Sequence, residues 1–420
     1  MHNISTLPNG LVLITINLPH LDSVTTLIDV GAGSRYETKN INGISHFLEH
    51  MFFKGSLKYP SAEQISTLID GIGAVNNAFT HKEFTGYWIK SSSKHIELAS
   101  DIISSMVRES LLSPEEIERE KGVIVEELRM VRDDPSRFIW DLYERLQFGD
   151  QPLGWDLGGS EGTINSFKRE DFINYMDSLY SPKNMVLVFA GKLPKNIDSL
   201  AKKYFSTLPG KKMRSFKPYQ KSKQVRPKIN IFFKKTDQAN IVLGVEGYSR
   251  YDKKRYVARV LSAILGEGMS SRLFIQVRER RGLAYHVSCD HGVYKDTGIF
   301  VASAGLKLEK VTDGLEVIVA ELKRVATEKV TDDELRKAKE MIRGRLAIRS
   351  ESTNFLAEYF GANFCLDRKI ETFEEYLKNI DAVSTQDIKE VAEELIRVER
   401  FNLQVIGPFA DKALFEKVLT

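Results

Sequence analysis

Apolar positions along the chain form two kinds of segment that alternate. LVLITI from Leu11, VTTLIDV from Val24 and NIVLGV from Asn240 have the length and β-branched content of strands. SPEEIEREKGVIVEEL from Ser113 and TDDELRKAKEMIRGRL from Thr331 instead place apolar residues at helical spacing among charges. Because strand-like runs come first and amphipathic helices follow, the pattern predicts an α+β chain with helices packed on mainly antiparallel sheets.

This pattern is present twice. VGAGSRYE from Val30 resembles VEGYSRYD from Val245, and each follows a strand-like stretch and precedes a helical segment. The two charged helical segments match next, and NMVLVFAGKL from Asn184 then resembles FNLQVIGPFA from Phe401. Three matches in the same order indicate an internal duplication, so we expect two homologous domains.

A basic connector separates the two copies. PGKKMRSFKPYQKSKQVRPK, residues 209–228, contains Lys and Arg but no Asp or Glu, and has Pro near both ends, which is typical of a solvated linker. The predicted domains are therefore residues 1–208 and 229–420. The linker could also bind nucleic acid, but the net charge of the 420-residue chain is only +3, so we expect no nucleic-acid partner.

Composition limits the expected location and redox chemistry. The first residues, MHNISTLPNG, lack the basic and long apolar regions of a secretory signal, and no apolar run has the length of a bilayer span. We expect a cytoplasmic protein without a membrane partner. Cys289 and Cys365 are the only cysteines, too few for a disulfide framework, which favours buried free thiols.

Local signals predict a helix around the sequence HFLEH. The span from Gly43 to Phe53 contains no proline. Asn40 and Asn42 precede it as candidate N-caps, and Lys54 and Gly55 follow it as a candidate C-terminus.

In this helix HFLEH carries three polar groups within an apolar run. His46 and His50 stand at i and i+4, and Glu49 at i+3, so the three side chains share roughly one face. H-x-x-E-H is the pattern in which two imidazoles bind zinc while the glutamate reaches the zinc-activated water. Burying these groups without compensation would be costly, and a metal ion would compensate all three.

A third ligand is expected downstream. In EREKGVIVEEL, Glu120 and Glu127 are two helical turns apart and share a face, while Glu126 points elsewhere. Glu127 would complete a His₂Glu set with one open position, and Glu120 would orient a ligand histidine. The alternative is that the histidines are ordinary core or surface residues and Glu127 a solvated charge.

The second copy lacks this set. When SRYE is aligned on SRYD, His46, Glu49 and His50 fall near Leu261, Ile264 and Leu265, and the corresponding alignment of the charged helices places Glu120 on Ala338 and Glu127 on Arg345. Apolar residues therefore suffice for packing at the helix positions, which favours a chemical role for the polar set in the first copy.

With these motifs the chain resembles the pitrilysin/insulinase-type metallopeptidases, in particular the short, dimeric bacterial members related to the mitochondrial processing peptidase β subunit. The resemblance covers essentially the whole chain. It rests on HFLEH, EREKGVIVEEL, NAFTHKEFTGYW from Asn77 and GEGMSSRLFIQVRERRGLAY from Gly266. It implies that one Zn²⁺ per chain is bound by His46, His50 and Glu127, with Glu49 as general base and Glu120 supporting the site.

The resemblance also implies roles for the second copy. Arg278 and Tyr285 match a family arginine and tyrosine that approach the substrate and stabilise the reacting carbonyl. In the family, two units close around a chamber with the zinc half of one unit facing the second half of the other, which implies a homodimer with shared sites. Taken alone, a basic helix residue and a half-buried tyrosine are ordinary features.

NAFTHKEF matches a family stretch whose edge strand pairs with extended peptide, so the candidate substrate residues are Asn77, Ala78, Phe79 and Thr80. The alternative is a core strand in which Asn77 caps a turn. Two positions depart from the family pattern. His81, in the first copy, stands where the family usually has a small residue, and Glu267, in the second copy, interrupts what is commonly a glycine run.

The predicted function is zinc-dependent endopeptidase activity on short or unfolded peptides inside a closed dimer chamber, with Glu49 removing a proton from the attacking water. The alternative is a non-catalytic or partner-dependent subunit that acts as a scaffold, because the family includes members that keep the fold and lose the chemistry.

Overall fold

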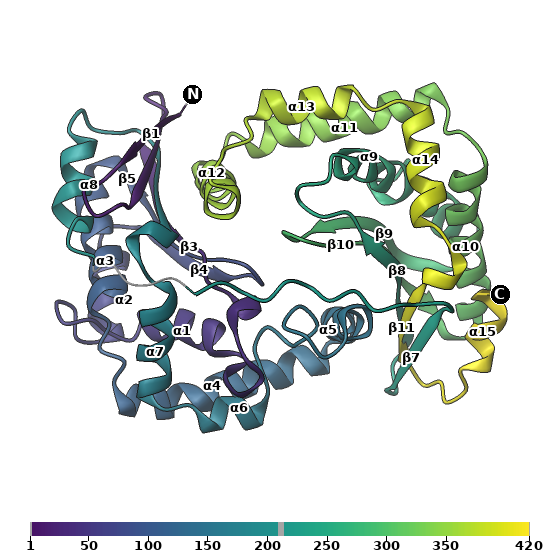
Figure 1. The fold of residues 1–420 in the computed structure, drawn as a ribbon, viewed down its shortest axis with the longest axis horizontal. Coiled ribbons are helices and arrows are strands. Elements are labelled where there is room, and N and C mark those ends of the chain that lie inside the picture. Colours follow the sequence, from purple (N-terminus) through teal and green to yellow (C-terminus); the bar gives the residue numbers. More distant parts are fainter. Residues whose placement is uncertain (1, 209–213, 420) are drawn as a thin grey trace. The chain divides into compact units, whose positions relative to one another are not determined.

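The structure is a computed structural model that describes residues 2–208 and 214–419. The chain forms two compact units (Figure 1). The first contains residues up to Arg129, Trp155–Lys217 and Ala347–Glu371; the second contains Met130–Gly154, Pro218–Leu346 and the residues from Thr372 onward.

The first unit is built on a six-stranded sheet with the order β1-β2-β6-β3-β5-β4. Only the β2–β6 pair is parallel, and the other neighbours are antiparallel. Strand β4 lies at one edge, so one side of its backbone has no neighbouring strand among the described residues. The strands are β1 (Asn3–Thr6), β2 (Val12–Asn17), β3 (Ser23–Val30), β4 (Val75–Thr80), β5 (Thr85–Ser92) and β6 (Met185–Gly191).

Helices cover both faces of this sheet. Alternate residues of β3 point in opposite directions: Val24 and Ile28 pack with α1, α3 and α7, while Thr25 and Asp29 lie toward α12. The helices that lie wholly or largely in this unit are α1 (Ile44–Phe52), α2 (Ala62–Gly71), α3 (Ile96–Glu109), α4 (Pro114–Asp133), α6 (Glu161–Ser166), α7 (Arg169–Leu179), α8 (Ile197–Phe205) and α12 (Thr353–Asp367).

The second unit is built on a five-stranded sheet with the order β7-β11-β8-β10-β9, in which only β7–β11 is parallel. On one face, Leu243 and Val245 pack with α9, α10 and α14; on the other, Val242 packs with α5. The elements are β7 (Lys228–Phe233), β8 (Gln238–Gly247), β9 (Ala284–Val293), β10 (Gly298–Lys307), β11 (Asn402–Gly407), α5 (Pro135–Phe148), α9 (Lys254–Gly266), α10 (Val311–Thr327), α11 (Asp332–Arg349), α13 (Phe373–Asp381), α14 (Thr385–Leu395) and α15 (Ala413–Leu419).

The two units repeat one plan. Strands β2, β6, β3, β5 and β4 occupy the same sheet positions, with the same directions, as β7, β11, β8, β10 and β9. The repeated segments recognised in the sequence are β3 and β8, α4 and α11, and β6 and β11. The prediction of an α+β chain with two duplicated, mainly antiparallel domains is confirmed.

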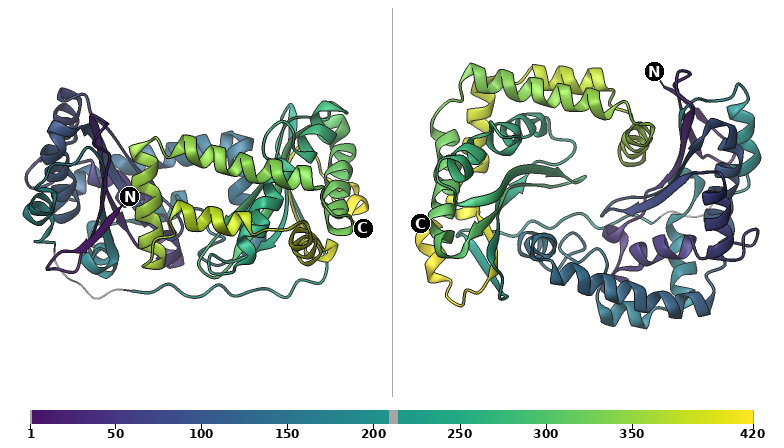
Figure 2. Two further views of the ribbon diagram at one scale, coloured as in Figure 1. Left: turned by 90° about the horizontal axis from the view of Figure 1, so that it is seen from above. Right: turned by 180° about the vertical axis from the view of Figure 1, so that it is seen from behind.

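Each unit also contains a helix from the other half of the sequence. Helix α12 follows α11 in the chain but packs on β3 and β6, and α5 follows α4 but packs on β8 and β11. The unit boundaries fall inside α4 and α11, both of which are continuous helices (Figure 2). The compact units are therefore discontinuous in sequence, and the division into residues 1–208 and 229–420 stays a prediction about the repeat.

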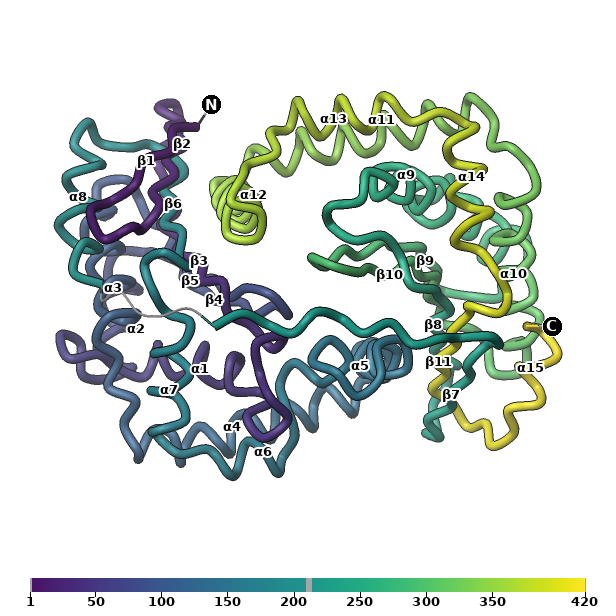
Figure 3. The backbone as a smooth tube through the Cα atoms, viewed as in Figure 1, coloured from purple at the N-terminus to yellow at the C-terminus, as the bar shows by residue number. Residues whose placement is uncertain are grey.

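The connector between the copies is only partly described. Of the predicted linker 209–228, residues 209–213 lie outside the described residues, and 214–227 form no helix or strand (Figure 3). Cys289 and Cys365 are buried and not disulfide-bonded, as predicted. Within residues 2–208 and 214–419, no helix is long and apolar enough to cross a bilayer.

Candidate active site

Helix α1 carries the H-x-x-E-H residues and begins one residue later than the sequence predicts. Its N-cap is Gly43, not Asn40 or Asn42, and no side chain of the N-cap residue bonds to the helix. Gly43 has φ 97°, and a Cβ there would lie 2.6 Å from the carbonyl oxygen of Gly158. Only glycine fits this start without strain.

A buried carboxylate replaces the missing cap. Glu37 accepts hydrogen bonds from the Gly43 N–H (2.8 Å), the Ser45 N–H (2.9 Å) and the Ser45 hydroxyl (2.6 Å). The Asn42 amide also donates to Glu37, at 3.0 Å, which explains why Asn42 is not the cap. Burial raises the pKa of Glu37, while these four donors lower it, so Glu37 anchors the N-terminus of the helix.

Three half-buried side chains come together at the predicted metal site. Ligand atoms of His46, His50 and Glu127 all lie within 4.8 Å of one another. Glu127 Oε2 is 3.8 Å from His46 Nε2 and 3.5 Å from His50 Nε2. Ligand atoms at zinc-bond lengths of about 2.0–2.1 Å in a tetrahedron are about 3.3 Å apart, so this His₂Glu set fits a zinc ion with small adjustments.

Glu120 lies behind this cluster. Its Oε1 is 2.9 Å from His50 Nδ1, which leaves Nε2 of the same ring directed toward Glu127. Lys54 Nζ lies 2.6 Å from the second oxygen of Glu120. A carboxylate that fixes the ring through Nδ1 is the usual support for a metal-binding histidine. The sequence predicts Glu120 in this place but gives no signal for Lys54.

The two histidines have opposite electrostatic surroundings. Burial would lower the pKa of His50, but the carboxylates of Glu120 and Glu127 raise it to about 9. Burial and the neighbouring His50 lower the pKa of His46 to about 4. The carboxylates of Glu120 and Glu127 therefore create a negative potential at this point, which stabilises positive charge and would favour a divalent cation.

Glu49 projects from the same helix as the two histidines. Burial raises the pKa of its carboxyl group, and a hydrogen bond from Thr80 opposes that rise. The Thr80 hydroxyl donates to Glu49 Oε2 at 2.5 Å. The sequence predicts Thr80 only as part of a substrate strand, and nothing in the local pattern signals this contact.

The stretch from Asn77 to Thr80 lies in β4, the edge strand of the first sheet. Ala78 and Thr80 are buried, while Asn77 is exposed and its side chain accepts a hydrogen bond from the adjacent Ala78 N–H at 2.9 Å. An edge position leaves backbone groups available for an added strand. Pairing with peptide stays a prediction.

Arg278 and Tyr285 lie together in the second unit. Arg278 is in η5 (Phe274–Glu279), a π-helical turn, and its guanidinium carbon is 5.1 Å from the centre of the Tyr285 ring. Tyr285 is 76% exposed, and Arg278 is half-buried. Short π-helical turns occur frequently at functional sites.

In the second unit, the positions that the repeat aligns with the predicted metal ligands have a different character. Leu261, Ile264 and Leu265 lie on α9 and are buried in the hydrophobic core of the second unit. Arg345, which the repeat aligns with Glu127, forms an ion pair with Glu267 at 2.8 Å, and Glu267 also pairs with Arg259. The departure at Glu267 thus supports an ion-pair network in the second copy.

Comparison with known proteins gives consistent matches over both halves. Residues 12–160 match the family model described as Insulinase (Peptidase family M16), and residues 166–342 match the one described as Peptidase M16 inactive domain. An uncharacterized zinc protease of Streptomyces coelicolor is 34% identical over 97% of this chain and 90% of its own length. The uncharacterized zinc protease YmxG of Bacillus subtilis is 35% identical over 96% of this chain and 97% of its own.

The fold also has close counterparts among solved structures. The crystal structure of a protease from Helicobacter pylori superimposes with a TM-score of 0.90 at 23% identity, covering 97% of this chain and 99% of that chain. This likeness extends over both units.

Proposed function

Because the chain belongs to the insulinase family of peptidases, family M16, we propose that it is a zinc-dependent endopeptidase that hydrolyses short or unfolded peptides. The observation that carries this proposal is the cluster of His46, His50 and Glu127, with Glu49 on the same helix as both histidines. One zinc ion per chain would be held by the three clustered side chains.

A bound zinc ion would supply Lewis-acid activation of a water molecule and of the scissile carbonyl group. Glu120 fixes the ring of His50, so that Nε2 faces the metal position. Glu49 acts as the general base: it removes the proton of the attacking water and passes it to the leaving amine. Its raised pKa favours this exchange, because a base whose pKa is closer to neutral also returns the proton readily.

Substrate binding is assigned to both units. The backbone of β4, at Asn77, Ala78, Phe79 and Thr80, pairs with extended peptide, which gives affinity with little demand on sequence. Arg278 and Tyr285 stabilise the charge that develops on the carbonyl oxygen. By the resemblance described above, they act in trans within a homodimer that encloses the peptide in a chamber.

The test compares wild type with Glu49→Gln on a library of fluorescence-quenched peptides, with metal content measured on both proteins. We expect about one zinc per chain in each, with turnover reduced at least about 100-fold in Glu49→Gln. Glu126→Gln is the matched control, because Glu126 is exposed and forms an ion pair with the exposed Arg129. Near-normal turnover by Glu49→Gln would exclude Glu49 as the base, and absence of metal would contradict the whole proposal.

A second candidate is a subunit that needs a different partner or serves as a scaffold. It is favoured by the match of residues 166–342 to a model described as an inactive domain. Bound zinc without cleavage of any library peptide would support this candidate. Cleavage by a purified preparation whose mass corresponds to two copies of this chain would exclude it.

A further inference from the structure

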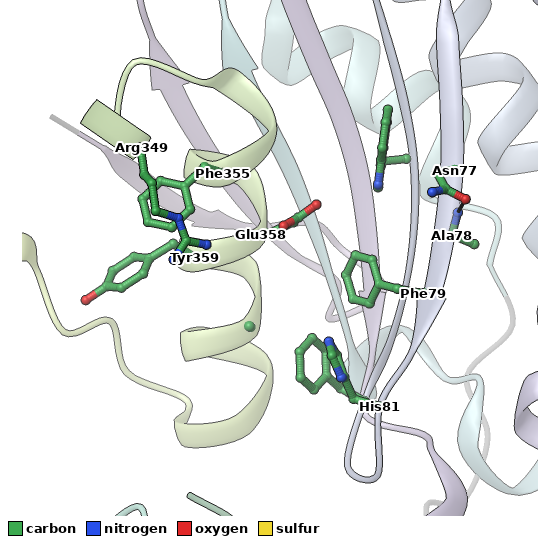
Figure 4. Close-up of a pocket in the computed structure, with 11 residues that line it drawn as sticks. Asn77, Ala78, Phe79, His81, Arg349, Phe355, Glu358 and Tyr359 are labelled. Atoms are coloured by element: carbon green, nitrogen blue, oxygen red, sulfur yellow. Dashed lines mark hydrogen bonds between the residues drawn. The ribbon is translucent and has the colours of Figure 1, made fainter. Parts of the chain in front are cut away.

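A cavity of about 470 Å³ lies in the first unit between α12 and the hairpin formed by β4 and β5 (Figure 4). Its wall is rich in aromatic rings and contains one carboxylate, Glu358, and one guanidinium, Arg349. The lining residues that matter here are Phe79, Phe84 and Trp88 from the hairpin, and Phe355, Glu358 and Tyr359 from α12. The cavity adjoins the edge strand that we assign to substrate.

The strand period connects this cavity with the active site. Successive residues of β4 point to opposite faces of the sheet. Thr80 points toward Glu49, whereas Asn77 and Phe79 line the cavity, and Ala78 between them also contributes to its wall. A peptide paired with β4 obeys the same alternation, so every second side chain of that peptide would be directed toward the cavity.

Glu358 is the one carboxylate that lines the cavity, and it points from α12 toward the hairpin (Figure 4). It has no hydrogen bond and no ion pair to any described residue. Burial raises the pKa of Glu358, and the Arg349 guanidinium opposes that rise. Arg349 itself lies over the Phe355 ring at 4.3 Å.

A second carboxyl group lies behind the first. Asp29 of β3 is fully buried, and neither of its oxygen atoms has a hydrogen-bond partner among the residues that the structure describes. A Cβ on Gly86 would lie 2.6 Å from Asp29 Oδ1, and one on Gly361 would lie 2.1 Å from Oδ2, so the group sits between hairpin and helix. Glu358 raises the pKa of Asp29 further, so the two carboxyl groups are close enough to interact, and the Arg349 guanidinium acts on Glu358.

The second unit provides an internal comparison. It has a cavity of about 680 Å³ in the corresponding place, between α5 and the strands β8 to β10. By the repeat, Gly244 replaces Asp29, and the strand register places Ser303 where the first unit has Trp88. The fold therefore does not require the buried acid or the indole at these positions.

We propose that the cavity beside β4 binds the lysine or arginine side chain of a peptide paired with that strand, with Glu358 as the residue that selects the positive charge. The inference rests on the proposed peptidase function and names its substrate class. Aromatic faces attract a cation that has lost part of its water, and a carboxylate facing them gives a charge-assisted hydrogen bond. An entering amine or guanidinium would supply the ion-pair partner that Glu358 lacks among the described residues.

The kinetic test uses quenched peptides in which one lysine is moved along a neutral sequence, each paired with a peptide carrying norleucine at the same position. In wild type we expect lysine to raise kcat/KM about tenfold or more over norleucine, and only at positions separated by two residues. Glu358→Gln should bring this ratio close to one. Glu63→Gln, at an exposed position on α2, controls for the change in net charge and should leave the ratio unchanged.

A binding test separates this inference from the proposed catalysis. Fluorescein-labelled lysine and norleucine peptides are titrated into Glu49→Gln and into the same protein with Glu358→Gln added. A lysine preference that depends on Glu358 supports the cavity even if no variant cleaves peptide. The inference is overturned by binding without lysine preference, by equal preference at every position, by a preference that survives Glu358→Gln, or by no binding of either peptide.

Discussion

One hydroxyl group, that of Thr80, joins the edge strand to the proposed base. It donates to Glu49 at 2.5 Å, so it holds one carboxylate oxygen and leaves the other for the water. We expect Thr80→Val to lower kcat about tenfold, the cost of losing one charge-assisted hydrogen bond, with zinc content unchanged. Thr80→Ser keeps the donor and should restore most of the rate. Equal kcat in Thr80→Val and wild type would contradict this positioning role.

The buried carboxyl of Asp29 makes a prediction about pH. Burial, and then Glu358, raise its pKa in the folded state, so between the unfolded and folded pKa values the native state holds a proton that the unfolded state releases. The contribution of this group to the unfolding free energy is therefore fully present below the unfolded pKa. It falls by about 1.4 kcal/mol per pH unit as the pH rises from the unfolded toward the folded pKa. Asp29→Asn removes this loss.

Urea unfolding of wild type and Asp29→Asn at several pH values measures the effect. The variant should match wild type near pH 3 and become the more stable protein as pH rises through the range above about 4. Asp22→Asn is the control, because Asp22 lies on the surface and pairs with an exposed lysine. An equal difference between Asp29→Asn and wild type at all pH values would exclude titration of Asp29 as the cause.

At the residue scale, helical spacing accounts for what the sequence could predict. His46, Glu49 and His50 share a face because they lie within one helix, and Glu120 and Glu127 do so because they are two turns apart. The contacts of Thr80 with Glu49 and of Lys54 with Glu120 could not be predicted, because each contact joins two different elements. The N-cap was predicted wrongly because Glu37, a residue outside the helix, performs the function that local propensity assigned to Asn40 or Asn42.

At the scale of single elements, Glu37 fixes where α1 begins and hence where its histidines point. Glu37→Ala removes an acceptor shared by two backbone N–H groups and a hydroxyl. We expect a loss of about 1–3 kcal/mol in unfolding free energy together with weaker zinc binding in a chelator competition.

The duplication supplies the control for that experiment. Asp252 occupies the corresponding place in the second unit and accepts a hydrogen bond from the Lys254 N–H at 2.8 Å, at the start of α9. Asp252→Ala should cost about 1 kcal/mol and leave zinc affinity unchanged. Unchanged zinc affinity in Glu37→Ala would reduce Glu37 to the same purely structural role.

At the scale of the whole molecule, the order of repeated motifs predicted the duplication, whereas the exchange of helices could not be predicted. Helix α12 has apolar residues around much of its circumference, including Leu356, Ala357 and Phe360, and such a pattern predicts burial without naming the sheet that provides it. Its partner is fixed by tertiary contacts, among them the Thr25 hydroxyl with Thr353 at 2.9 Å.

The position of α12, which comes from the second half of the sequence but packs in the first unit, predicts how fragments behave. A fragment of residues 1–208 contains the entire first sheet but not α12. The amide hydrogens of β3 and β6 should therefore exchange rapidly with solvent, and the uncovered face of these strands should bind a hydrophobic dye. Adding a synthetic peptide of residues 347–371, the segment that completes the first unit, should restore protection; a peptide with scrambled sequence should not. Full protection of the fragment alone would show that the segment is dispensable for the first sheet.

The late position of α12 in the sequence also has a consequence for synthesis on the ribosome. Strand β6 ends at Gly191, but α12 is complete only at Asp367. At roughly 5–20 residues per second, translation of the intervening segment takes about 9–35 s. Throughout that interval one apolar face of the first sheet is finished but uncovered. We therefore expect the nascent chain to bind chaperones during this interval, and replacing the codons of this segment with slower ones should increase aggregation.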